Sequence, residues 1–100
     1  MTSLQVIEHV PGPAWLSGVG FRDQPGVADH RATMKGWLAA GQLVMGGPFL
    51  DGEGGGMAIV RFDDVGAAAA AAQSDPAVQA GLLVATARPW LAGLSAVDFG

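Results

Sequence analysis

The chain has 100 residues, of which half are apolar and 14% are charged, and it carries a net charge of −4. This length allows one domain with a core of its own, and the five cations form no run that could bind nucleic acid or an anionic membrane surface. Because the chain has no cysteine, disulfides, iron–sulfur clusters and thiolate zinc sites are excluded. We recognise no secretory leader and no apolar span of ~18 residues, so we expect a cytoplasmic protein.

The N-terminal part predicts one strand and a long loop. Residues 4–10 are rich in β-branched side chains, and the Pro-Gly-Pro of 11–13 ends the strand. In the loop that follows, up to residue 23, we expect Trp15 and Phe21 to fold back onto the body of the domain.

A helix is predicted over residues 25–40. Asp23 or Gln24 lies near its N-cap, and Pro25 suits the first turn, where a missing amide hydrogen breaks no helical bond. Gly41 is well placed to end the helix in the left-handed conformation.

Two short strands are predicted next. Residues 42–45 form the first, which ends at the Gly-Gly-Pro of 46–48, and residues 57–62 form the second. The glycine-rich segment 51–56 between them is interpreted as a flexible connection, because a phosphate-binding loop would need a strand before it and a helix after it.

The C-terminal part predicts a second helix and a last strand. Asp63 or Asp64 caps a helix that runs through the alanines 67–72, and Asp75 before a proline interrupts it. The remaining elements are a short helix at 76–80, a strand at 82–88 and an apolar tail that begins at Pro89.

The order strand, helix, strand, strand, helix, strand predicts the ferredoxin-like plan βαββαβ, an α+β fold whose four-stranded antiparallel sheet carries both helices on one face. We expect one domain over 1–100, with a core of 4–91 and a C-terminal tail of 92–100. The other sheet face would be bare and partly apolar, because neighbours such as Ile59 and Val60 point to opposite faces. A homodimer with the sheets packed face to face would cover it.

Three further kinds of site find no support in the residue pattern. RNA-binding domains of this topology stack bases on aromatic residues of the central strands, where this chain has only Phe62 at a strand end. The histidines His9 and His30 lack a spaced ligand motif, and His9 and Glu8 point to opposite faces of a strand, so no metal site is expected. No Gly-x-Ser-x-Gly motif supports a serine nucleophile.

His30 is the first candidate for chemistry. On a helix over 25–40 it shares a face with Val27, Met34 and Trp37, which directs it inward or into a cleft. It can be a buried imidazole bonded to a backbone carbonyl, or a general acid/base, since imidazole titrates near neutral pH.

Asp75 is the second candidate, and its position before a proline is that of an ordinary helix N-cap. A capping carboxylate can still offer its second oxygen to a neighbour, where it would fix the tautomer of an imidazole. A third candidate is the segment Gly46, Gly47 and Pro48, because absent side chains let backbone amides line a pocket. A simple turn is the alternative there.

Five segments together are similar to those of a known family. They are Pro-Gly-Pro-Ala-Trp at 11–15, Gln-Pro-Gly-x-x-x-His at 24–30, Gly-Gln-Leu-Val-Met-Gly-Gly-Pro-Phe at 41–49, Ser-Asp-Pro-Ala-Val-x-x-Gly at 74–81 and Arg-Pro-Trp at 88–90. On these motifs the chain resembles the YCII-related (YciI-like) domain proteins of the dimeric α+β barrel superfamily, from about residue 4 to 91.

The resemblance implies a ferredoxin-like fold, a homodimer, no tightly bound cofactor and a His/Asp active centre, which maps onto His30 and Asp75. The role of most members is unassigned. Some relatives act in ring-cleavage or dehalogenation pathways of aromatic compounds, and the wider superfamily includes cofactor-free oxygenases and lactone isomerases. One departure is the second helix, which is nearly all alanine where relatives usually carry glutamates.

Our leading hypothesis is a small cofactor-independent enzyme that acts on a small cyclic or aromatic molecule by isomerisation or elimination. His30 would move a proton, Asp75 would orient it and stabilise its charge, and the segment 46–48 would bind the substrate. The alternatives are a non-catalytic dimeric module that binds a small molecule in the same pocket, and a passive scaffold in which His30 is a core residue.

Overall fold

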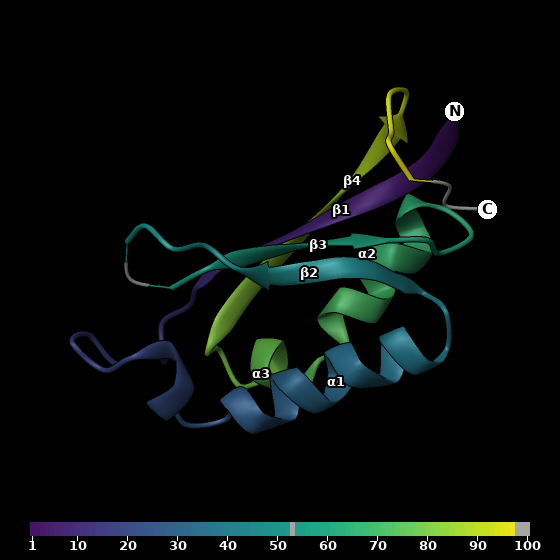
Figure 1. Ribbon diagram of the computed structural model, residues 1–100. Helices are drawn as coiled ribbons and strands as arrows, with labels where there is room; N and C mark the ends of the chain where they lie inside the picture. The colour runs from purple at the N-terminus through teal and green to yellow at the C-terminus, as the bar shows by residue number, and fades with distance from the viewer. Residues whose placement is uncertain (53, 98–100) are drawn as a thin grey trace.

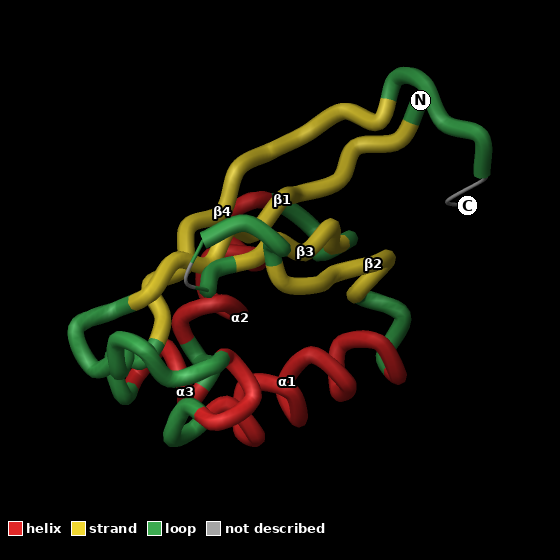
Figure 2. Tube along the Cα trace, turned by 60° about the vertical axis from the view of Figure 1, so that its left-hand side comes forward, coloured by secondary structure: helices red, strands yellow, loops and turns green. Residues whose placement is uncertain are grey.

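One antiparallel sheet and the helices on one of its faces form the two layers of the structure (Figures 1 and 2). This computed structural model describes residues 1–52 and 54–97. In chain order the elements are β1 (Thr2–Pro11), the 3₁₀ turn η1 (Phe21–Asp23), α1 (Val27–Ala39), β2 (Leu43–Pro48), β3 (Gly56–Val60), α2 (Val65–Gln73), α3 (Pro76–Gln79) and β4 (Leu83–Ala92). The predicted α+β, ferredoxin-like fold is confirmed.

The strands lie in the order β2-β3-β1-β4, and every neighbouring pair is antiparallel. The central strand β1 pairs with β4 along its whole length and with β3 over its second half. This register places His9 between Gly56 of β3 and Ala85 of β4. Residues in register share a face of the sheet, so these two small neighbours leave room for the imidazole.

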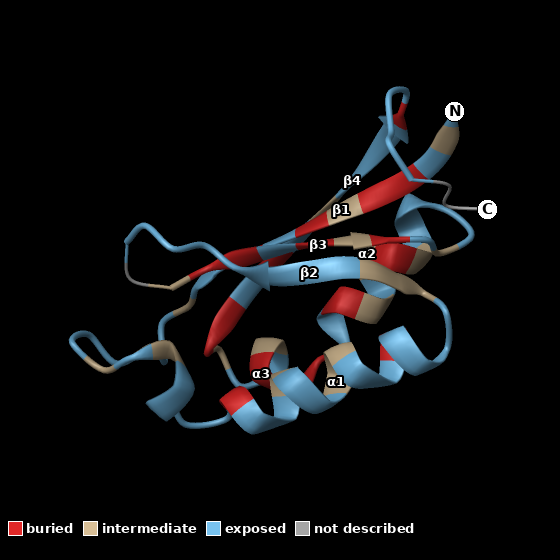
Figure 3. Ribbon diagram, viewed as in Figure 1, coloured by how far each residue is buried: buried red, intermediate tan, exposed pale blue. Residues whose placement is uncertain are grey.

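Two clusters of buried side chains join the sheet to the helices, and Figure 3 marks the buried residues along the ribbon. In the larger one, Ala68 and Ala72 of α2 lie one turn apart and are completely buried with Ile7 of β1. In the smaller one, Trp15 and Phe21 pack against buried residues of α1, α3 and β4, which confirms that the loop after β1 folds back. Alanine thus suits the inner face of α2, because a small side chain lets a helix approach a sheet closely.

The start of α1 differs from the prediction. Gly26, with φ +88°, is the N-cap and gives no side-chain cap, and the proline before it lies outside the helix. Gln24 does not cap the helix; it is buried and accepts a hydrogen bond from the Leu16 amide at 2.9 Å. Its amide group donates to the carbonyls of Leu16 and Val19 at 2.8 Å each. Gln24 therefore shapes the loop that carries Phe21.

Both edge strands are longer than predicted. β2 continues through the segment 46–48, which pairs with β3, so this segment is strand rather than the end of one. β4 continues through Pro89 to Ala92, because β1 offers partners up to Thr2. A proline is tolerated on an edge strand, where its missing amide hydrogen breaks no ladder bond. The tail predicted from Pro89 is thus partly strand, and its residues 98–100 lie outside the described part of the chain.

Other turns form as predicted. Gly41 has φ +76°, which is the left-handed stop after α1, and Asp64 caps α2 by accepting the amide hydrogen of Ala67 at 2.7 Å. Among the described residues, no helix is long and apolar enough to cross a membrane. The cytoplasmic location and the division into core and tail stay predictions.

The sheet face opposite the helices carries exposed apolar side chains. Val10 and Val84 lie directly opposite each other on β1 and β4 and are 43% and 46% exposed. Met45 of β2 and Met57 of β3 are also exposed on this outer face. No described helix lies against it (Figure 2).

Candidate functional site

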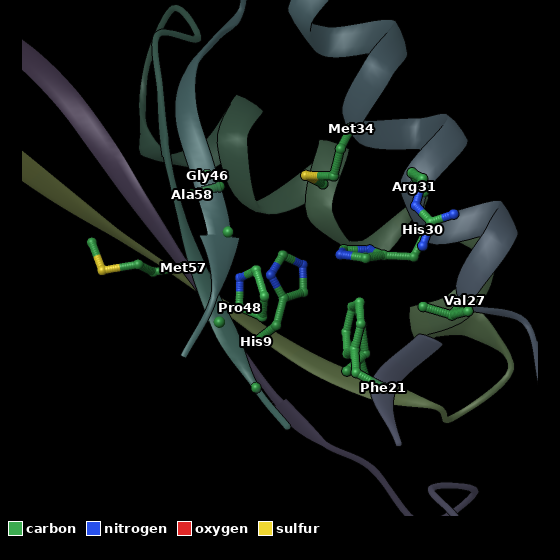
Figure 4. Close-up of a pocket in the computed structure, with 14 residues that line it drawn as sticks. His9, Phe21, Val27, His30, Arg31, Met34, Gly46, Pro48, Met57 and Ala58 are labelled. Atoms are coloured by element: carbon green, nitrogen blue, oxygen red, sulfur yellow. The ribbon is translucent and has the colours of Figure 1, made fainter. Parts of the chain in front are cut away.

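A pocket of about 280 Å³ lies between α1 and the helix-facing side of the sheet (Figure 4). Its walls come from η1, α1 and all four strands, and apolar side chains predominate among them. Gly46, Gly47 and Pro48 all line the β2 wall, so the segment predicted to bind substrate does border the pocket. Whether it binds a ligand stays a prediction.

Gly55 and Gly56 line the same pocket beside β2. They are buried, although the segment 51–56 is predicted as a flexible connection; its residue 53 lies outside the described part of the chain. A Cβ atom on Gly56 would lie only 2.5 Å from the carbonyl oxygen of Gly47. Glycine is therefore required for β2 and β3 to approach each other at this wall.

His30 and Asp75 form a hydrogen-bonded pair of side chains. The Nδ1 atom of His30 lies 2.5 Å from Oδ2 of Asp75, although the two residues are 45 positions apart in the chain. The His30 side chain is 13% exposed and extends from α1 into the pocket (Figure 4), while the Asp75 side chain is completely buried and does not line the pocket. The sequence predicted an inward-facing His30, and the structure bears this out.

The two carboxylate oxygens of Asp75 accept hydrogen bonds from different groups. Asp75 is the N-cap of α3, and its Oδ1 atom accepts the amide hydrogen of Ala77 at 2.9 Å while Oδ2 accepts from His30. The expectation that a capping carboxylate can offer its second oxygen to an imidazole is confirmed as geometry. Its catalytic role stays a prediction.

The surroundings of Asp75 keep its carboxyl group ionised. Burial alone would raise its pKa, but the hydrogen bonds from His30 and Ala77 and the charges of the two histidines together lower the pKa below its ordinary value. An ionised carboxylate can only accept, so Nδ1 of His30 carries the hydrogen of this bond. The other ring nitrogen, Nε2, is therefore free to exchange a proton with a molecule in the pocket.

His9 is the site residue that the sequence analysis did not find. It projects from β1 into the pocket (Figure 4), is 4% exposed and stands edge-on to the His30 ring with the ring centroids 4.8 Å apart. Its Nε2 atom is buried without a hydrogen-bond partner. Burial and the nearby charge of His30, opposed by the charge of Asp75, lower the pKa of His9 from 6.5 to about 4. His9 is therefore neutral at neutral pH.

A sequence signal for His9 does exist. Side chains alternate along a strand, so His9 shares the inner face of β1 with Gln5 and Ile7, both of which are buried. This alternation gives only the face of the strand. That His9 lies beside His30 depends on how β1 packs against α1, which the local sequence does not determine.

The three polar groups also bear on metal binding. His9, His30 and Asp75 each offer a ligand atom, and these atoms lie within 4.8 Å of one another. Two ligand atoms on one zinc ion are roughly 3 Å apart, given bond lengths of about 2 Å, whereas His30 Nδ1 and Asp75 Oδ2 are at hydrogen-bond distance. A metal ion would have to separate this pair, so the expected absence of a metal site stays a prediction.

The fold and the site together define a ferredoxin-like α+β domain with a paired histidine and aspartate at its pocket. The family model described as YCII-related domain matches residues 6–90, and the chain belongs to this family. No curated protein matches the chain.

Asp64 and Asp75 each cap a helix, so comparing them tests how much the buried His30–Asp75 pair contributes to stability. Asp75→Ala removes a cap and the partner of His30, and we expect it to lower the free energy of unfolding by about 3 kcal/mol or more. Asp64→Ala removes only an exposed cap and should cost about 1 kcal/mol. Urea denaturation of both variants measures the difference. Equal losses would show that the buried pair adds nothing beyond a cap.

The low pKa of His9 predicts a dependence of stability on pH. Between pH 6.5 and about 4 the unfolded chain binds a proton at His9 that the folded chain does not, so stability falls as the pH is lowered through this window. The shift corresponds to about 3 kcal/mol. His9→Asn removes this contribution. The difference between the unfolding free energies of the wild-type protein and His9→Asn should therefore change between pH 7 and pH 4. A constant difference would contradict the neutral, buried state of His9.

Proposed function

We propose that this protein is a cofactor-independent enzyme that moves a proton on a small cyclic or aromatic molecule, in an isomerisation or an elimination. The observation that carries the proposal is the buried Asp75 bonded to a histidine whose other nitrogen faces a pocket. A carboxylate that orients an imidazole in this way is a recurrent arrangement in general acid/base catalysis. Membership of the YCII-related family is compatible with it but assigns no reaction.

The chemistry would need three groups with separate tasks. The Nε2 atom of His30 accepts a proton from the substrate and returns it to another atom, or holds it while a leaving group departs. Asp75 fixes the tautomer and stabilises the imidazolium that forms. His9, which stays neutral, adds no second positive charge beside His30. Gly46, Gly47 and Pro48 would hold the substrate against β2.

The dimensions of the pocket support a single substituted ring. A buried apolar cavity of ~150 Å³ is enough to bind benzene, and this pocket measures about 280 Å³. Its apolar walls include Phe21, Val27 and Met34, which suit the faces of a ring. The reaction itself is not specified by these walls.

The alternative is a module that binds the same kind of molecule without converting it. The unpaired Nε2 of His9 favours a site with a polar ligand over a passive core, because a buried polar atom without a partner is costly. Turnover is what distinguishes the enzyme from the binding module.

Proton exchange tests the proposal directly. We expect the wild-type protein to speed deuterium incorporation from D₂O into at least one member of a panel of cyclic ketones, lactones and hydroxylated aromatics, followed by NMR. His30→Gln should lower this rate about a hundredfold or more, since it removes the proton acceptor. Asp75→Asn keeps a capping oxygen but should also lower the rate, and exposed Asp29→Asn on α1 is the control.

An exchange rate that survives His30→Gln would overturn the assignment of His30 as the base. Saturable binding of a panel member without any exchange would instead favour the binding module. In both cases the folding of each variant is checked by its urea denaturation curve.

We also propose that two copies of the chain pair through their bare sheet faces. This face carries Val10, Val84, Met45 and Met57, which are between 37% and 51% exposed, although the exposed Glu8 lies among them. Exposed apolar side chains gathered on one face mark an interaction surface. A twofold contact between identical faces is the simplest way to cover it.

Val84→Glu should convert the dimer to a monomer, because each copy would bring a further negative charge into the paired faces. Leu38→Glu is the matched control, since Leu38 is 58% exposed on α1, away from this face. Light scattering after size exclusion measures the mass of each. A wild-type monomer at all concentrations would refute the pairing.

A further inference from the structure

Arg31 is a positive charge at the pocket for which the described residues provide no ion-pair partner. It follows His30 on α1, lines the pocket and is exposed, which places it at the mouth (Figure 4). The single ion pair among the described residues is that of His30 and Asp75. The residues one helical turn away are Val27, Ala28, Met34 and Lys35. None of them is acidic, so no local carboxylate neutralises Arg31.

The inside of the pocket does not neutralise this charge either. No Asp or Glu is among the described residues that line it. Asp75 lies behind His30 and is fully occupied by His30 and the Ala77 amide. The chain has a net charge of −4, and Arg31 is the one arginine or lysine among the described residues that line the apolar pocket. It suits a ligand that brings its own negative charge.

The apolar walls of the pocket indicate the size and chemistry of the rest of such a ligand. Phe21 and Met34 face the space beside His30 (Figure 4), and Val27 and Leu83 complete an apolar surface. An acetate-sized anion would leave these walls unfilled, whereas the volume of about 280 Å³ admits one substituted ring. A guanidinium presents donors in a fork that matches a carboxylate.

We infer that the pocket binds small ring compounds that carry a carboxylate, with the ring on the apolar wall beside His30 and the carboxylate on Arg31. The inference rests on the proposed function in that it names the substrate class of the same pocket. It assigns Arg31 as the residue that selects acidic over neutral ligands, and it leaves the reacting proton to His30.

A matched set of probes tests this inference. Benzoate, its neutral analogue benzamide and the ringless anion acetate are titrated into ¹⁵N-labelled protein, and amide shifts around the pocket give the affinities. We expect benzoate to bind about tenfold more tightly than benzamide, as one charge-assisted pair provides, and acetate to bind more weakly than benzoate. The preference should weaken as salt is added.

Variants of two neighbouring cations locate the preference. Arg31→Gln should bring the affinities for benzoate and benzamide to within about twofold of each other, and Arg31→Lys should restore part of the difference. Lys35→Gln, one turn further along α1 and not in the pocket wall, is the control and should keep the wild-type preference.

The inference is overturned if wild-type protein binds benzoate no better than benzamide, if it binds neither, or if Lys35→Gln abolishes the preference as fully as Arg31→Gln does. The experiments distinguish failure of this inference from failure of the proposed function. If proton exchange depends on His30 but benzoate binds no better than benzamide, only the substrate class is refuted. An anion preference that depends on Arg31, without exchange of any ring carboxylate, refutes only the enzyme.

Discussion

The burial of one carboxylate is the constraint on which the rest of the site depends. Asp75 is completely enclosed, and a buried charge is stable only when its oxygens are hydrogen-bonded. The amide of Ala77 satisfies one oxygen and His30 satisfies the other. Because His30 is on α1, the pair ties that helix to the junction of α2 and α3. The same contact therefore holds the helical layer together and aims an imidazole at the pocket.

His9 sets the electrostatic balance of the pair. It is neutral because it is buried and because His30 is close, so it adds no positive charge beside His30. The sheet admits this second ring only because its register neighbours are Gly56 and Ala85. A buried nitrogen without a partner destabilises the fold. That a strand at the centre of the sheet carries such a group indicates that the pocket, and not the core, explains its presence.

The sequence predicted what local chemistry determines and missed what depends on contacts across the fold. The order of elements, the left-handed Gly41 and the cap formed by Asp75 follow from turn and cap preferences close along the chain. The bond from Asp75 to His30 spans 45 positions, and the family resemblance implied it. Gln24 was misplaced because its partners, Leu16 and Val19, become available only once the loop folds. The extension of β4 and the position of His9 beside His30 depend on strand register, which neither pattern nor propensity specifies.

The charges of the site also constrain what it can bind. Asp75 is ionised and His9 is neutral, so before it takes up a proton His30 leaves one negative charge behind the pocket. An anionic ligand alone would be repelled by this charge, and removing a proton from it would add another. Arg31 at the mouth offsets the charge of the ligand, and the proton gained by His30 offsets that of Asp75. With Arg31, one net negative charge remains at the site both before and after the proton moves to His30, because the charge created on the ligand is matched by the charge that His30 gains. Without Arg31 the net negative charge would be two, which is why an acidic ring compound requires this arginine.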